Sequence, residues 1–275
     1  MPNRALCLIH ANCQGEPLAD LLCLSPDFAR LFQIRHYTNY TKEPVPQQCL
    51  DTASVFLYQH MAPCWKEVSS EALLARLAPS AARFCIPNPL FKGYWPFWTS
   101  HGAVDFGDTV LDRLIDAGAQ KPEILKIYLG GDVRRFADLD AVAASSLAHE
   151  YKKEVPCDVK TAHIVEELWR KEPLFYTVNH PGKRLLLQVA DAVMDFLGLP
   201  PLSSGVKDSY EPEYAEFEQP IHPQLAEHMG LPFARTGHEF RIYKRRMDFA
   251  RYVSRYIDCR QQGMAQGFQA YLQLV

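Results

Sequence analysis

The sequence of 275 residues lacks three features that would place it in a specialised class of protein. It has no apolar run close to the about 20 residues that a membrane-spanning helix needs. It has no marked excess of charge of one sign: 29 basic and 32 acidic residues give a net charge of -3, which argues against broad nucleic-acid binding. Its eight cysteines include no CxxC pair. Close ligand pairs typify zinc sites and Cys-dense short chains typify disulfide scaffolds, so neither is expected here.

What remains is the composition of an ordinary globular protein, with 48% hydrophobic and 22% charged residues. The first apolar run, within 4–10, is too short for the core of a secretory signal. Most cysteines lie inside apolar segments such as "FCIP" and "LLCL", where a small buried thiol in a reducing compartment is the simplest interpretation. We therefore expect a cytoplasmic protein. Cys13 alone stands in a polar setting.

Strand-like and helix-like segments alternate over the first part of the chain. The pattern predicts strands at 4–10, 31–37, 54–60 and 82–87, with helices at 16–24 and 69–79. Such alternation predicts an α/β fold: an open, mostly parallel sheet flanked by helices. We expect residues 1–275 to form a single α/β domain.

The rest of the chain elaborates this pattern. Residues 87–107 are rich in proline, glycine and aromatics and predict an ordered loop, either over a pocket or sealing the core. Residues 107–172 predict a mostly helical insertion, with Asp158 as a helix cap. A strand at 174–178 should then return to the sheet and lead, through a polar turn, into a long amphipathic helix. Residues 240–275 predict a C-terminal helix that packs on the domain.

Two polar turns carry the chemistry. The first is Asn12-Cys13-Gln14-Gly15 and the second is Asn179-His180-Pro181-Gly182; each lies between a predicted strand and a predicted helix. In an open parallel sheet, ligands bind beyond the carboxyl ends of the strands. If the two strands are neighbours, Cys13 and His180 form a Cys–His pair, and the helix start favours a thiolate at neutral pH.

In that arrangement Asn12 and Gln14 would serve as oxyanion donors. The alternative is that Cys13 is structural and that the second turn only caps a helix.

Three segments resemble a known family. "ANCQGEPLADLL" is similar to the opening motif of the WcbI-type polysaccharide-biosynthesis family, and "LFYTVNHPGKRLLLQVADAVMDFLGL" and "QPIHPQLAEHMGL" resemble its later signatures. The chain has Ala11 where many relatives have Gly. The resemblance implies a fold related to the SGNH hydrolases and a cytoplasmic role in capsular polysaccharide assembly. It also implies that Cys13, Gln14 and His180 form the core of the site, with Asn12 and Asn179 beside them.

The resemblance further implies that the protein binds coenzyme A or acetyl-coenzyme A and O-acetylates a sugar precursor. The phosphates of coenzyme A require basic groups or helix starts. Lys183 and Arg184 are the first candidates, and the others are Lys92, Arg134 and Arg135. Adenine stacking is expected from the aromatic loop, from Tyr94, Trp95, Phe97 or Trp98. Each of these residues has a simpler alternative role, in surface solubility or core packing.

Among the histidines outside the two motifs, His60 is the most plausible accessory because it ends a predicted strand at the edge that carries Cys13. His101 and His163 have no such setting.

Three functions from different classes remain open at this point. The protein is an acyltransferase that uses a coenzyme A thioester and a sugar or nucleotide-sugar acceptor, or a thiol esterase that uses water. The third option is a non-catalytic coenzyme A-binding partner of a biosynthetic complex. The sequence leaves the acceptor, covalent acylation of Cys13 and assembly into a homo-oligomer undecided. It predicts no nucleic-acid partner and no metal.

Overall fold

The computed structural model describes residues 4–101, 106–263 and 267–274, and the chain divides into two compact units. Unit 1 comprises Met1–Pro89, Glu150–Val165 and His180–Glu213, and unit 2 comprises Leu90–His149, Glu166–Asn179 and Tyr214–Val275. The predicted helical insertion therefore contributes to both units. Within the described ranges, no helix combines the length and the apolar character needed to cross a membrane.

Unit 1 is built on a four-stranded parallel sheet in the order β2-β1-β3-β4. Its strands are β1 (Ala5–Ala11), β2 (Phe32–Thr38), β3 (Ala53–Gln59) and β4 (Ala82–Ile86). All four lie within two residues of the predicted ends, because short apolar runs bounded by polar turns define buried parallel strands well. The α/β class and the parallel sheet predicted from the sequence are confirmed.

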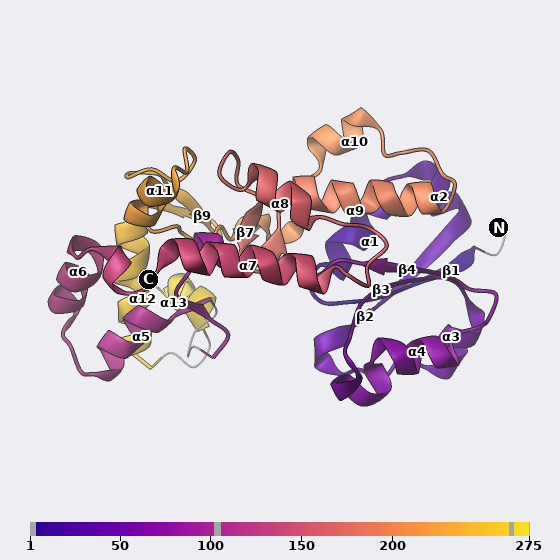
Figure 1. Ribbon diagram of the computed structural model, residues 1–275, viewed down its shortest axis with the longest axis horizontal. Helices are drawn as coiled ribbons and strands as arrows, with labels where there is room; N and C mark the ends of the chain where they lie inside the picture. The colour runs from indigo at the N-terminus through magenta and orange to yellow at the C-terminus, as the bar shows by residue number, and fades with distance from the viewer. Residues whose placement is uncertain (1–3, 102–105, 264–266, 275) are drawn as a thin grey trace. The chain divides into compact units, whose positions relative to one another are not determined.

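Helices cover both faces of this sheet (Figure 1). On one side are α3 (Gln47–Thr52) and α4 (Ser70–Arg76), and on the other are α1 (Gly15–Cys23) and α9 (Lys183–Phe196), which pack against each other. Ser69 caps α4 by accepting a hydrogen bond from the N–H of Ala72. The remaining elements of unit 1 are α2 (Pro26–Leu31), η1 (Asn39–Thr41), η2 (Pro63–Val68), β8 (His180–Pro181), α10 (Ser204–Ser209) and part of α7 (Leu139–Lys153) and α8 (Ala162–Leu168).

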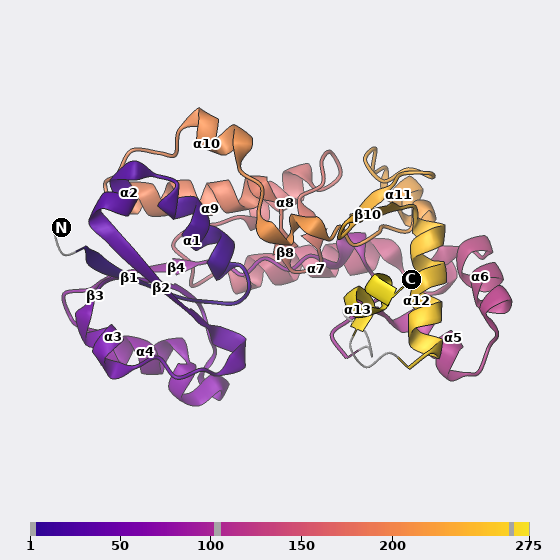
Figure 2. The same ribbon diagram turned by 180° about the vertical axis from the view of Figure 1, so that it is seen from behind.

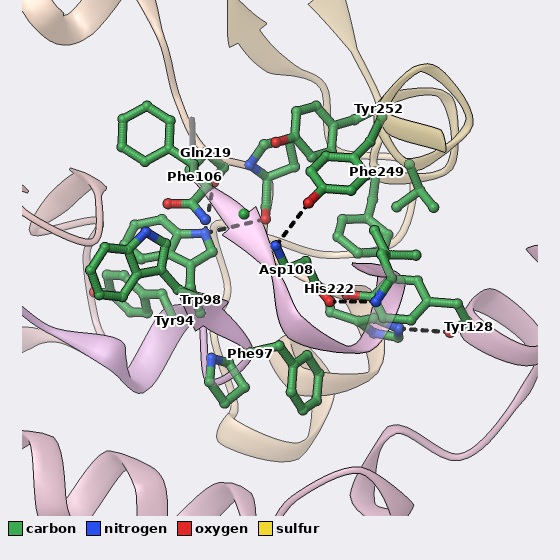
Figure 3. Close-up of a pocket in the computed structure, with 17 residues that line it drawn as sticks. Tyr94, Phe97, Trp98, Phe106, Asp108, Tyr128, Gln219, His222, Phe249 and Tyr252 are labelled. Atoms are coloured by element: carbon green, nitrogen blue, oxygen red, sulfur yellow. Dashed lines mark hydrogen bonds between the residues drawn. The ribbon is translucent and has the colours of Figure 1, made fainter. Parts of the chain in front are cut away.

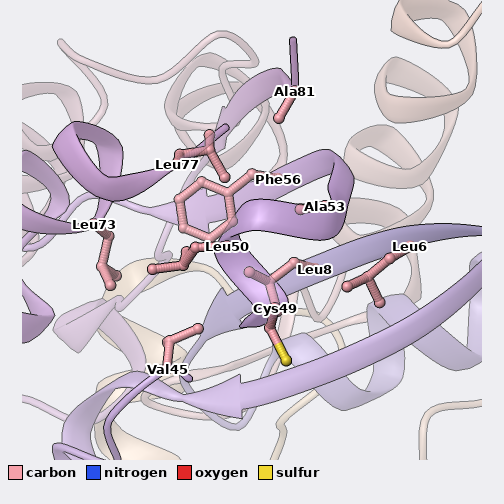
Figure 4. Close-up of a cluster of buried hydrophobic side chains, with 10 residues drawn as sticks. All are labelled: Leu6, Leu8, Val45, Cys49, Leu50, Ala53, Phe56, Leu73, Leu77 and Ala81. Carbon is pink, nitrogen blue, oxygen red and sulfur yellow. The ribbon is translucent and has the colours of Figure 1, made fainter. Parts of the chain in front are cut away.

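The hydrophobic core between the sheet and the first helix layer comes from alternate strand positions (Figure 4). Leu6 and Leu8 of β1 and Phe56 of β3 point toward α3 and α4, where Leu50 and Leu73 meet them. Phe56, Leu8, Leu50 and Leu73 are fully buried. Each such side chain contributes about 1.5–3 kcal/mol on burial, so this layer holds α3 and α4 against the two central strands, β1 and β3.

Unit 2 is mostly helical. Its helix α12 (Phe249–Gln261) packs against α5 (Thr109–Asp116), α6 (Lys121–Gly130) and α13 (Gly267–Leu274). The smaller elements are η3 (Lys92–Tyr94), β5 (Trp98–Thr99), β6 (Gly107–Asp108), η4 (Val133–Arg135), β7 (Phe175–Thr177), η5 (Glu213–Glu216, at the boundary), α11 (Pro223–Met229), β9 (Phe240–Ile242) and β10 (Arg245–Met247). Figure 2 shows α12 and the β10 hairpin from behind.

Three predictions about elements are wrong. The predicted helix at 240 begins as the β9–β10 hairpin, and α12 starts only at Phe249, after its cap Asp248. The strand β7 is not part of the four-stranded sheet. Asp158 does not cap α8: the carboxylate of Glu154 accepts from the N–H groups of Thr161 and Ala162 instead.

Candidate functional site

The turn that carries Cys13 is closed by its own polar groups. Asn12 Oδ1 accepts a hydrogen bond from the N–H of Gln14 at 2.9 Å, and the N–H of Gly15 donates to Asn12 O at 2.9 Å. A Cβ at Gly15 would lie 2.3 Å from His36 Nε2 and 2.9 Å from Ala11 Cβ, so a larger residue here would have to displace these side chains. The turn therefore has a fixed shape at the carboxyl end of β1.

A network of side-chain amides supports this turn from the neighbouring strands. Gln59, the last residue of β3, accepts at Oε1 from the N–H of Asn12 (2.8 Å) and from Asn39 Nδ2 (3.2 Å). Its Nε2 donates to Gln14 Oε1 and to Pro87 O, both at 3.2 Å. Gln59 is fully buried, and both the oxygen and the nitrogen of its side-chain amide form hydrogen bonds. It fixes the backbone and side chain of the turn together.

Asn88, just after β4, completes the network. Its Oδ1 accepts from Asn12 Nδ2 at 2.9 Å and from Gln14 Nε2 at 3.5 Å. Gln14 Nε2 also donates to Pro89 O at 3.0 Å. The Asn88 Nδ2 group, the donor end of the same amide, is not one of the atoms that form these hydrogen bonds.

Sequence analysis missed Gln59, Asn39 and Asn88. Each follows, or ends, one of the predicted parallel strands, as the Asn-Cys-Gln turn follows β1. An amide at the carboxyl end of every strand of the sheet was the available signal, since those ends meet at one edge.

Cys13 itself is half-buried. Burial raises the pKa of its thiol, and a backbone hydrogen bond opposes this only in part. This direction is opposite to the thiolate expected at neutral pH, because desolvation outweighs the backbone hydrogen bond; Cys13 lies one residue before Gln14, the N-cap of α1.

His180 belongs to the same unit as Cys13 and is also half-buried. It begins β8, directly before α9, and burial lowers the pKa of its imidazole to about 4. The ring is therefore neutral at pH 7. The strand before it does not join the sheet, so a pairing of strands is not what relates the two polar turns. Instead α9, which follows His180, packs against α1, which follows Cys13. Asn179 falls in unit 2, where its Oδ1 accepts from Thr177 Oγ1 at 3.1 Å.

The basic candidates are divided between the units. Lys183 and Arg184 open α9 in unit 1; Lys183 Nζ donates to Asp208 O at 2.8 Å and Arg184 is exposed. The N-cap of α9 is Gly182, which has no side chain to accept hydrogen bonds from the first N–H groups of the helix. In unit 2, Arg134 forms an ion pair with Asp132.

The other two basic candidates lie in unit 2 as well. Lys92 Nζ lies 5.2 Å from the centroid of the Trp98 ring, and Arg135 is exposed.

The aromatic loop is mainly core. Tyr94 is 1% exposed and donates a hydrogen bond to Trp169 O at 2.5 Å, while Trp95 and Phe97 are also buried. Trp98 is half-buried and is the accessible ring of this group. Of the accessory histidines, His60, His101 and His163 are exposed; His60 directly follows Gln59.

Unit 2 also holds a small aromatic cavity (Figure 3). Asp108 lines it: one carboxylate oxygen caps α5 and the other accepts from the hydroxyl of Tyr128 at 2.5 Å. Burial raises the pKa of Asp108 to about 6. The cavity measures about 30 Å³, room for one water and not for a sugar ring. We therefore interpret it as part of the core of unit 2.

No cluster of His, Cys, Asp and Glu side chains suited to a metal ion occurs among the residues placed by the structure. Fold and site together define an α/β protein with a cysteine held in an amide-lined turn at the carboxyl edge of a parallel sheet. The family model described as "Polysaccharide biosynthesis enzyme WcbI" matches residues 6–202. The chain belongs to this family.

One similar solved structure is that of WcbI, described as a novel polysaccharide biosynthesis enzyme and as the native protein without a disulfide bond between coenzyme A and one of its cysteines. The two chains are 17% identical with a TM-score of 0.75, and the match covers 98% of this chain and 94% of that one. At this identity the likeness establishes the fold. No curated protein matches the chain.

Proposed function

We propose that this member of the WcbI family binds coenzyme A and transfers an acetyl group from acetyl-coenzyme A to a hydroxyl of a sugar or nucleotide-sugar in capsular polysaccharide biosynthesis. The observation that carries the proposal is the fixed amide cage around Cys13, a half-buried thiol at the edge of the sheet where substrates bind. Since acetyl-coenzyme A is a cytoplasmic metabolite, we place the activity in the cytoplasm. We further propose that the site is related to that of the SGNH hydrolases, with cysteine in place of serine.

The protonation states favour general-base catalysis over a pre-formed ion pair. The pKa of Cys13 is raised and that of His180 lies near 4, so a resting thiolate–imidazolium pair is strongly disfavoured. A neutral imidazole nevertheless has one unprotonated ring nitrogen at pH 7, which is able to accept a proton during the reaction. His180 then removes the thiol proton as the Cys13 sulfur attacks the thioester carbonyl.

The group transfer balances in two half-reactions. The Cys13 sulfur bonds to the acetyl carbon, the bond to the coenzyme A sulfur breaks, and the proton held by His180 goes to the departing thiolate. The acceptor hydroxyl then attacks the acetyl group on Cys13, His180 takes its proton, and the released Cys13 thiolate is reprotonated. In the first half-reaction a thioester on Cys13 replaces the thioester of coenzyme A, so this half-reaction is nearly isoenergetic.

The developing oxyanion needs donors, and Asn88 supplies one in this proposal. The side-chain amides of Asn12 and Gln14 already donate to Asn88 Oδ1, and Asn88 Nδ2 is not one of the atoms in these hydrogen bonds. In this proposal the oxyanion donor is Asn88 and not Asn12 or Gln14, the donors expected from the sequence, and those two side chains hold the Asn88 amide in place.

Lys183 and Arg184 at the start of α9 are our choice for the coenzyme A phosphates, since a 14-residue helix with an uncapped start favours an anion there. Lys92, Arg134, Arg135 and Trp98, the other candidates from the sequence, belong to unit 2 and are not part of this proposal.

The test combines binding and turnover. Thermal melts should rise most with coenzyme A, less with dephospho-coenzyme A and least with pantetheine; a hundredfold excess over Kd stabilises by about 2.7 kcal/mol. Acetyl-coenzyme A with nucleotide-sugar and heptose acceptors should give acetylated products by mass spectrometry. Cys13→Ala should lose the product and keep coenzyme A binding, whereas Cys23→Ala, at an exposed cysteine on α1, should keep both.

Two outcomes would contradict this function. Thioester hydrolysis that no acceptor outcompetes would make the protein an esterase. Binding of coenzyme A without any turnover, unchanged in Cys13→Ala, would make it a binding partner.

A further inference from the structure

A second pair of reactive groups lies in unit 1, apart from the residues assigned above. Cys85 is in β4, an edge strand of the sheet, and Cys157 is in the segment that follows α7. The two segments are joined directly: the N–H of Asp158 donates to Cys85 O at 2.8 Å, and the N–H of Cys85 donates to Asp158 Oδ2 at 2.6 Å. The Cys157 thiol also reaches Ile86 O, with sulfur and oxygen 3.5 Å apart. The two cysteines are thus held side by side.

Three donors converge on the sulfur of Cys85. The hydroxyl of Tyr58 and the backbone N–H of His60 are hydrogen-bonded to it, and the single S–H of Cys157 is shared between it and Ile86 O. Tyr58 is the register partner of Cys85 across the β3–β4 pair, so the strand pairing itself places this donor. A sulfur that accepts three hydrogen bonds is stabilised as a thiolate.

The electrostatic balance at Cys85 differs from that at Cys13. The hydrogen bond from Cys157 lowers the pKa of Cys85, and this outweighs burial and the nearby Asp158 carboxylate, which raise it. The pKa of Cys157 is raised, first by its hydrogen bond to Cys85 and then by burial. Cys85 alone also has the Tyr58 hydroxyl and the His60 N–H beside it, so we assign Cys85 as the nucleophile and Cys157 as the thiol that resolves it.

We propose that Cys85 and Cys157 are a redox-active dithiol that closes to an intrachain disulfide in response to hydrogen peroxide. A nucleophilic cysteine in contact with a second thiol is the arrangement that oxidant-sensing proteins use. Cys85 is 1% and Cys157 7% exposed, which restricts the oxidant to a molecule as small as peroxide. The turn beside them is at the surface, with Val155 77% exposed, so a local opening gives access.

The chemistry is balanced with peroxide as the single oxidant. The Cys85 thiolate attacks one peroxide oxygen, the O–O bond breaks, and a sulfenic acid and hydroxide form; the hydroxide combines with the proton that Cys85 released on ionising to give the first water. The Cys157 sulfur then attacks the sulfenic sulfur, its proton leaves with the hydroxyl as a second water, and the disulfide forms. Two thiols are oxidised by two electrons and one peroxide is reduced.

The disulfide would fasten the segment after α7 to the edge of the sheet. Lys153, at the end of α7, donates to Asn88 O at 2.5 Å, so the fastened segment is the one that contacts Asn88. Closing a loop of roughly 70 residues also restricts the unfolded chain, and we expect the Tm to rise by about 5 °C or more.

The test uses the full-length protein. Reduced protein is treated with hydrogen peroxide, quenched with catalase, blocked with N-ethylmaleimide in denaturant and digested without reductant. Mass spectrometry should find the Cys85 and Cys157 peptides linked and lighter by two hydrogen atoms, and dithiothreitol should separate them. In Cys157→Ser, dimedone should trap the sulfenic acid on Cys85, and the Tm gain should vanish.

Cys259→Ser is the matched control, because Cys259 is a buried cysteine of unit 2 and its loss should leave the linked peptide in full yield. The proposal would be overturned if peroxide oxidises the exposed Cys23 and Cys64 but Cys85 and Cys157 are both recovered with N-ethylmaleimide attached. It would also be overturned by a Cys85 that proceeds to sulfinic acid in the wild-type protein without forming the link. Neither result depends on acetyl transfer.

Discussion

Gln59 Oε1 accepts a hydrogen bond from the backbone N–H of Asn12 at 2.8 Å, so a side chain of β3 fixes the backbone beside Cys13. Gln59→Leu would fill similar space and leave the Asn12 N–H, the Asn39 amide and Gln14 Oε1 without this partner. Buried polar groups that lose their partners cost about 1–3 kcal/mol each, so we expect a loss of about 2–4 kcal/mol in the free energy of unfolding. Urea denaturation measures it. Gln33→Leu, at an exposed position of β2, should change stability by less than about 0.5 kcal/mol.

Gly15→Ala should destabilise the protein because a Cβ there would lie 2.3 Å from His36 Nε2 and 2.9 Å from Ala11 Cβ. Overpacking of this kind costs about 1–3 kcal/mol. Gly205→Ala is the control: it lies in α10 with nothing within 4 Å of its Cβ position and should be neutral or slightly stabilising. Adding His36→Ala to Gly15→Ala should recover part of the loss. A double variant no better than the single one would show that the clash is not with His36.

His10 gives the protein a pH-dependent stability. It is 1% exposed, neither ring nitrogen has a hydrogen-bond partner in the described part of the chain, and burial first, then His36, lowers its pKa to about 4. The unfolded chain takes up a proton below about pH 6.5 and the folded protein only near pH 4. Stability is therefore retained above pH 6.5 and lost as the pH falls toward 4, by about 3 kcal/mol from this group.

Urea titrations between pH 7.5 and 4.5 measure this slope. His10→Leu should flatten it in part, because His180, with its pKa also lowered to about 4, contributes a slope of the same sign. His163→Gln, at an exposed histidine, should leave it unchanged. An undiminished slope in His10→Leu would mean that His10 is hydrated or paired in solution.

His180→Ala tests the proposed base. General-base assistance contributes about 10²–10⁴ in rate, so acetyl transfer should fall by that factor while coenzyme A affinity changes only a few-fold. In the wild-type protein kcat/KM should rise with pH through about 4, where His180 loses its proton, and the variant should lack this limb. If His180→Ala were as active as the wild type, the turn Asn179-His180-Pro181-Gly182 would have only a structural role.

Asn88→Asp separates the two ends of one amide. The carboxylate still accepts from Asn12 and Gln14, so the turn should remain stable, but the Nδ2 donor is lost. We expect kcat to fall about 10²–10³-fold, the usual cost of one oxyanion donor. The free energy of unfolding measured in urea should stay within about 1 kcal/mol of that of the wild type. A large loss of stability with unchanged kcat would show that Asn88 is structural and not the oxyanion donor.

The parts of the fold that the sequence predicted are those with local signals. Runs such as Leu6–Ile9 and the proline and serine boundaries of α4 define elements by themselves. The sequence did not predict the β9–β10 hairpin, because each strand has only three residues in which to show an alternating pattern. The hairpin is also rich in basic residues, like the helix after it.

For the candidate site, too, the sequence predicted only the residues that have a local signal. The odd residue types in the Asn-Cys-Gln turn pointed to Cys13, but Gln59 and Asn88 are 45 or more positions away from it, and pairing across the sheet is not visible in one sequence. The protonation state of Cys13 could not be predicted either, since desolvation depends on burial.

The division of the chain has a consequence for synthesis. Each unit is assembled from three separate stretches, and unit 1 is complete only when Glu213 has been made. A protein cut after Pro89 would keep all four strands yet lack α9, leaving one face of the sheet partly uncovered. The nascent chain must therefore hold an unfinished sheet while more than a hundred further residues emerge from the ribosome. Because α9 packs on β4, with Phe196 against Phe84, early exposure of β4 is a hazard that chaperones would have to manage.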